Sequence, residues 1–122
     1  MSDRKLRLGA FIMATGHHIA AWRHPGAQID SGTNIDHYIE VAKTAERGLF
    51  DQVFVADSPG LWFDGDDEAF SRQGRVSHFE PVTLWAALAT ATKHIGFVAT
   101  ASTTYEDPYL LARKFASLDH IS

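Results

Sequence analysis

The chain has 122 residues, of which 45% are hydrophobic and 21% are charged, a composition typical of one globular domain. Its formal net charge of −4 argues against a general nucleic-acid-binding surface. Cysteine is absent, which excludes a disulfide framework, a thiol nucleophile and thiolate metal ligands, and agrees with a cytoplasmic location.

The first apolar run covers residues 6–13 and lacks strict alternation of apolar and polar side chains. Such a run is typical of a strand buried on both faces of a parallel sheet. It is too short to span a membrane, and we interpret it as a first core strand. The long loop that follows contains the turn-forming residues Pro25, Gly26, Ser31 and Gly32.

Apolar residues at helical spacing predict a first helix that begins near residue 35. Thr33 or Asn34 can cap its first turn, and Gly48 is expected to end it. The apolar stripe of this helix consists of Ile35, Tyr38, Ile39, Ala42, Ala45 and Leu49.

A second buried strand is predicted over residues 52–56, and Asp57 closes it. A long loop then occupies residues 58–79. The second helix begins at Pro81, because proline at the first helical turn sacrifices no hydrogen bond. Its buried stripe is expected to consist of Leu84, Trp85, Leu88 and Ala91.

Residues 95–99 predict a third strand, and a third helix is predicted from Pro108 to about residue 118. The resulting order βαβαβα is typical of parallel strands joined by right-handed crossovers. The residues of the third helix expected to point inward are Leu111, Ala112, Phe115 and Leu118.

Two closures suit this α/β order, an open doubly wound sheet and a (β/α)8 TIM barrel. A dinucleotide-binding sheet should show G-x-G-x-x-G after its first strand, but only Gly16 occurs there. The barrel is therefore favoured, and residues 1–122 would be a single incomplete domain, its first three βα units, because barrels need about 250 residues. Three units leave an open inner face and two open edges, so we expect either self-association or a longer chain. The side chains expected on the inner face are Leu8, Ala10, Phe54 and Phe97, or their neighbours.

The loops after the three strands begin at Ala14, Asp57 and Thr100, and they should share one mouth because consecutive strands pair. Asp57 is either an acceptor for ligand N–H or hydroxyl groups, or a turn cap over Pro59 and Gly60. Thr100 can hydrogen-bond a cofactor, or its hydroxyl can bond the loop backbone. The same two interpretations hold for Ser102, Thr103 and Thr104.

Three histidines, His17, His18 and His24, lie in the first loop without H-x-H or H-E-x-x-H spacing, so we predict no metal site. They either handle substrate or protons at the mouth or are ordinary polar loop residues. Trp62 and Phe63, in the second long loop, either cover the barrel rim or wall an apolar pocket. The acidic run in that loop is interpreted as a solvated segment; it consists of Asp64, Asp66, Asp67 and Glu68.

Three segments resemble the bacterial luciferase-like flavin monooxygenases: ATGHHIAAWRHP, AERGLFDQVFVAD and FEPVTLWAALATATKHIGFVATASTTYEDPYLLARKFASLDHIS. The resemblance covers nearly the whole chain. Within that family it is to the group containing nitrilotriacetate monooxygenase, dibenzothiophene-sulfone monooxygenase and pristinamycin IIA synthase.

The resemblance implies a (β/α)8 barrel that binds reduced FMN, supplied by a separate NAD(P)H:flavin reductase, and uses O2 to oxygenate a small organic substrate. It places Asp57 and Thr100 against the flavin and His17 and His18 on the substrate side, without assigning a catalytic residue. It also implies that the phosphate-binding residues lie in a segment beyond residue 122, and we expect the parent enzyme to be a homo-oligomer. The alternative is a non-catalytic barrel fragment that acts only as an assembly or structural piece.

Overall fold

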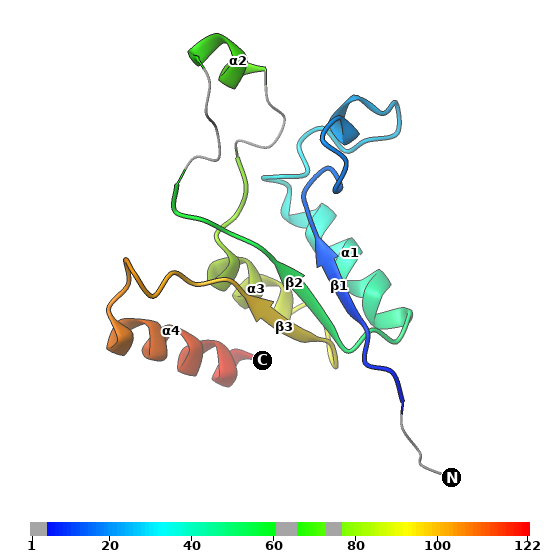
Figure 1. The fold of residues 1–122 in the computed structure, drawn as a ribbon. Coiled ribbons are helices and arrows are strands. Elements are labelled where there is room, and N and C mark those ends of the chain that lie inside the picture. The colour runs from blue at the N-terminus through cyan, green and yellow to red at the C-terminus, as the bar shows by residue number, and fades with distance from the viewer. Residues whose placement is uncertain (1–4, 61–65, 73–76) are drawn as a thin grey trace.

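A three-stranded parallel sheet organises the fold. The computed structural model describes residues 5–60, 66–72 and 77–122. The strands β1 (Gly9–Ile12), β2 (Gln52–Val55) and β3 (Gly96–Ala99) pair in the order β1-β2-β3. Figure 1 shows the strands side by side, with α1 and α3 on the face away from the viewer. The predicted α/β order with parallel strands is therefore confirmed.

The first helix, α1 (Ile35–Arg47), is capped by Asn34, whose side-chain oxygen accepts a hydrogen bond from the backbone N–H of His37 at 3.1 Å. Of the two caps considered, the asparagine is thus the one used. Gly48 ends the helix as predicted. The expectation that Leu49 belongs to the buried stripe is wrong. Leu49 has a φ of 60° and is 84% exposed, because the chain has already left the helix and turned toward β2.

The second long helix, α3 (Pro81–Ala89), carries the centre of the core. Glu80 precedes it, and its carboxylate accepts hydrogen bonds from the backbone N–H groups of Val82 and Thr83 at 2.8 and 2.9 Å. Trp85 is fully buried and stacks on Phe97 of β3 with ring centroids 5.1 Å apart. The predicted stripe is confirmed for Leu84, Trp85 and Leu88, whereas Ala91 follows the helix end.

The last helix, α4 (Pro108–Ile121), packs beside α3. Asp107 caps it by accepting hydrogen bonds from the backbone N–H groups of its first turn. Leu118 is buried and Leu111 is half-buried, but Ala112 and Phe115 are exposed, contrary to the inward positions predicted for them. The reason is that β3 is an edge strand of this sheet, so α4 has a helical neighbour on one flank.

A short helix, α2 (Asp67–Ser71), lies in the segment interpreted above as a solvated loop. The Oδ1 atom of Asp66 accepts a hydrogen bond from the backbone N–H of Ala69 at 2.8 Å, and Glu68 forms an ion pair with Arg72. The acidic run therefore caps and favours a helical turn. Trp62, Phe63 and Asp64 lie outside the described residues.

The two faces of the sheet differ in what covers them. The face toward the helices carries the buried core, to which Ile12, Val53 and Val55 belong. Ala10 and Phe97 pack against the same core, so the prediction that they point to the inner face is wrong. Leu8 lies before β1, and Phe54 is on the opposite face as predicted. In register with Phe54, that face also carries Phe11 and Val98, which are 45% and 37% exposed.

Among the helices of the described residues, none combines the length and apolar character that a membrane crossing needs.

Candidate functional site

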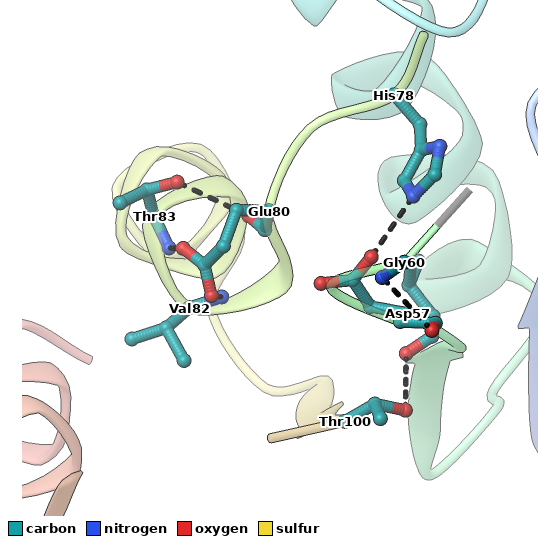
Figure 2. A network of polar contacts seen from close by, with 9 residues as sticks. Asp57, Gly60, His78, Glu80, Val82, Thr83 and Thr100 are labelled. Carbon is teal, nitrogen blue, oxygen red and sulfur yellow. Dashed lines mark hydrogen bonds and ion pairs between the residues drawn. The ribbon is translucent and has the colours of Figure 1, made fainter. Parts of the chain in front are cut away.

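Two of the predicted site residues meet at the carboxyl ends of neighbouring strands. Asp57 follows β2 and Thr100 follows β3, and these strands pair in parallel with Val55 opposite Ala99. The hydroxyl of Thr100 donates a hydrogen bond to the backbone oxygen of Val55 at 3.2 Å, which ties the two strand ends together (Figure 2). The structure therefore brings Asp57 and Thr100 to the same edge of the sheet.

The carboxylate of Asp57 is bonded by a residue that sequence reasoning missed. The Oδ1 atom of Asp57 lies 2.9 Å from Nε2 of His78, and Figure 2 shows the imidazole directed at the carboxylate. The turn over Pro59 and Gly60 is capped by Ser58, whose Oγ accepts a hydrogen bond from the backbone N–H of Gly60 at 3.3 Å. The turn cap proposed for Asp57 is thus supplied by its neighbour.

Partial exposure keeps the pair reachable from solution. The side chain of Asp57 is 22% exposed and that of His78 is 38% exposed. A half-buried carboxylate at the end of a parallel strand is where α/β proteins hold ligands. The signal that could have found His78 is its position just before Glu80, the cap of α3, because the loop that leaves the sheet at Asp57 returns to it there.

The histidines of the first loop have separate roles. His17 Nε2 lies 2.9 Å from the backbone oxygen of Phe11, and its ring meets the Phe11 ring edge-on at 4.6 Å. His17 therefore sits over the end of β1, next to the exposed inner face. His18 and His24 each accept, at Nδ1, a hydrogen bond from a backbone N–H two residues later in the chain, at 3.1 and 3.0 Å. These bonds shape the loop locally, and within the described ranges no hydrogen bond joins His17 to Asp57 or Thr100.

The other predicted hydroxyls lie in the turn before α4. Ser102 is half-buried, and its backbone oxygen accepts a hydrogen bond from the N–H of Glu106 at 3.2 Å. Thr103 and Thr104 are exposed. Thr100 is thus the hydroxyl residue that stands directly at the strand end.

A hollow of about 420 Å³ runs along β1, lined by Phe11, His17 and Gly26 and, from α1, by His37 and Val41. Its lining includes residues from both faces of β1, so it follows the unpaired edge of the sheet. Asp57 and Thr100 are not among its lining residues, and we assign the site to the strand ends on chemical grounds. Within residues 5–60, 66–72 and 77–122, no three His, Asp or Glu side chains are grouped as ligands of a metal ion.

Comparison with known proteins identifies the family. The profile of the luciferase-like monooxygenase family matches residues 10–122. The chain belongs to this family. It is 49% identical over 119 residues to N-acetyl-S-(2-succino)cysteine monooxygenase of Bacillus subtilis (strain 168), covering 98% of the chain and 26% of that protein. It is 42% identical over 127 residues to nitrilotriacetate monooxygenase component A of Aminobacter aminovorans, covering 99% and 28%.

Solved structures agree with the sequence relatives. The long-chain alkane monooxygenase LadA superposes with a TM-score of 0.85 at 35% identity, covering 98% of the chain and 29% of LadA. The riboflavin lyase RcaE, solved with modified FMN and riboflavin, superposes with a TM-score of 0.83 at 33% identity, covering 98% and 28%. The chain thus spans between a quarter and a third of the length of these relatives. The predicted fold, the first three βα units of a (β/α)8 barrel, is confirmed.

Proposed function

We propose that the protein containing this chain is an FMN-dependent monooxygenase, the oxygenase component of a two-component system. It uses reduced FMN and O2 to oxygenate a small organic substrate, and a separate NAD(P)H:flavin reductase of the cytoplasm supplies the reduced flavin. The observation that carries the proposal is the pairing of Asp57 and Thr100 at neighbouring strand ends, in a chain of the luciferase-like monooxygenase family. A relative named as a "component A" and a structural neighbour solved with modified FMN support the two-component and flavin parts.

The chemistry of the two residues fits a flavin. An ionised carboxylate only accepts hydrogen bonds, and among the described residues Oδ2 of Asp57 has no partner while Oδ1 is held by His78. Thr100 uses its proton on the Val55 carbonyl, which leaves its oxygen as an acceptor. The isoalloxazine ring carries an N–H and the ribityl chain carries hydroxyls, which are the donors that such acceptors need. When bound, reduced FMN supplies the reaction with oxygen, and the chain supplies binding and orientation.

The side of the site toward β1 is assigned to the substrate. His17 is held over the end of β1 by its bond to Phe11, and the apolar row of Phe11, Phe54 and Val98 begins beside it. Apolar surface with one convergent polar group is the usual lining of a small-molecule pocket. His17, with His18 next to it in sequence, is therefore proposed to meet the organic substrate.

Equilibrium dialysis of the protein expressed from its full reading frame tests the proposal. We expect FMN to bind and NAD(P)H to bind far more weakly, because the first strand lacks a dinucleotide-binding loop. Product formation should then require a reductase that delivers reduced flavin. Tight NAD(P)H binding without FMN binding would contradict the assignment.

A second candidate function is that of a non-catalytic barrel piece that acts in assembly. The observation that favours it is the exposed row Phe11, Phe54 and Val98, which lies between two unpaired strand edges. If residues 1–122 are made alone, we expect them to self-associate through this surface and to bind FMN weakly. Sedimentation decides the matter, since a stable monomer with a sharp unfolding transition contradicts the expectation.

A further inference from the structure

The contact between His78 and Asp57 joins the two ends of a long connection. The residues are 21 positions apart, one at the start of the β2–α3 segment and the other at its end. Because the ionised carboxylate offers only acceptors, the imidazole must carry its proton on Nε2 and donate it to Oδ1. A hydrogen bond to a charged group is stronger than one between neutral groups.

The backbone on both sides of His78 is held in place. Before it, the carbonyl oxygen of Ser77 lies so close to Gly32 that a Cβ at position 32 would stand 2.0 Å from it. After it, the ring of Phe79 meets the buried ring of Tyr38 edge-on, with centroids 5.8 Å apart. The next residue, Glu80, caps α3. His78 is therefore fixed between the first loop and the core, and its imidazole is a preorganised donor.

We infer that His78 is a positioning residue for Asp57, an inference that rests on the proposed flavin site. By donating to Oδ1, His78 fixes the rotation of the carboxylate and leaves Oδ2 to accept a hydrogen bond from the bound flavin. Without that donor, the carboxylate can rotate or turn to water, and flavin binding must supply the ordering itself.

A purely structural role predicts something different. If the bond only closes the loop, its loss lowers stability and leaves the affinity of the folded protein for FMN unchanged. Glutamine and asparagine separate the two roles, because a glutamine amide reaches the place of Nε2 and the shorter asparagine amide does not. The two variants have the same polar group, so a difference between them reports on the position of the donor.

The test is a fluorescence titration of FMN with the protein expressed from its full reading frame, together with thermal unfolding of each variant. The variants are His78→Ala, His78→Asn and His78→Gln. His94→Ala is the matched control, since His94 is an exposed histidine before β3, at the opposite edge of the sheet. We expect the FMN dissociation constant to rise about tenfold or more for His78→Ala and His78→Asn. It should stay near the wild-type value for His78→Gln and His94→Ala.

The outcomes are distinct. Unchanged FMN affinity in a folded His78→Ala or His78→Asn protein overturns the positioning role while leaving the proposed function intact. An equal loss of affinity in His78→Gln and His78→Asn, in step with their unfolding temperatures, also overturns it. If His78→Ala does not fold, the comparison of glutamine with asparagine still decides. A wild-type protein that binds no flavin overturns both the positioning role and the proposed function.

Discussion

Glu46, near the end of α1, holds the backbone of His94 in the turn before β3. Its Oε1 atom accepts a hydrogen bond from the N–H of His94 at 2.6 Å, and further bonds from Lys93 and Ile95 at 2.8 and 3.1 Å. One carboxylate oxygen thereby satisfies three successive backbone donors that precede an edge strand. These hydrogen bonds, that of His94 first, hold the pKa of Glu46 below its usual value.

Replacing Glu46 with Gln should lower the urea midpoint of unfolding, because the three donors lose a charged acceptor. The folded pKa is depressed, so the stabilisation is present above the pKa of the unfolded chain and is lost as pH falls through the folded value. The difference between wild type and variant should thus be greatest near neutral pH and shrink on acidification. Urea titrations at several pH values measure it, with the exposed Glu40→Gln as control. A difference that does not depend on pH would contradict the role of the charge.

Gly32→Ala should destabilise the protein by about 1–3 kcal/mol, the usual cost of forcing an extra group into a packed site. The new methyl group would stand 2.0 Å from the backbone oxygen of Ser77, which must move and displace His78 with it. We therefore expect weaker FMN binding as well. Gly26→Ala is the control, because its nearest contact at 3.4 Å is to the His24 side chain. Equal stability of the two variants in denaturant titrations would show that the first loop yields freely.

Asp57→Ala should weaken FMN binding by about 1–3 kcal/mol, the cost of leaving a ligand donor unpaired. The fold should remain intact, because the neighbouring turn is capped by Ser58. Fluorescence titration measures the affinity and circular dichroism the fold. Asp36→Ala removes an exposed carboxylate from the first turn of α1 and should leave FMN affinity unchanged. If Asp57→Ala also binds as tightly as wild type, the carboxylate has no part in the flavin site.

Thr100→Val keeps the shape of the side chain and removes one hydroxyl. We expect FMN affinity to fall by about 0.5–1.5 kcal/mol, the net worth of a neutral hydrogen bond. The lost bond to the Val55 carbonyl should lower stability by a similar amount. Paired titrations with FMN and with urea separate the two effects. Lower stability at unchanged affinity would make Thr100 a purely structural tie between β2 and β3.

Trp85→Ala should cost about 3–5 kcal/mol of unfolding free energy, the range for removing a buried large aromatic side chain. Trp85 is fully buried and stacks on Phe97, so the cavity would open between α3 and β3. Trp22→Ala, in the half-exposed turn of the first loop, is the control and should cost far less. Similar losses for both variants in denaturant titrations would place the centre of the core elsewhere.

Local signals predicted much of this fold. Asn34 and Glu80 cap α1 and α3 because each is a polar residue directly before an apolar helical stretch. The strand ends at Asp57 and Thr100 could be located because the apolar runs stop there.

What could not be predicted depends on distant contacts. The unalternating run around Ala10 carries no information about which parity faces the helices, and the pairing register decides it. Leu49 fits the helical spacing, but the turn into β2 places it in solvent. The partner of Asp57 is 21 residues away, beyond the range of any local pattern.

The two edges of the sheet divide the work of the chain. At the amino ends of the strands, Glu46 secures the turn before β3 and Asp51 accepts the backbone N–H of Leu8 at 2.7 Å, so carboxylates there hold backbone to backbone. At the carboxyl ends, Asp57 and Thr100 present acceptors outward. Mutations at one edge need not disturb the other, because distant sites contribute nearly independently to stability. An ancestral chain of this kind could therefore diversify its chemistry by altering the mouth, with its folding secured at the base, which gives the scaffold room to evolve new specificities.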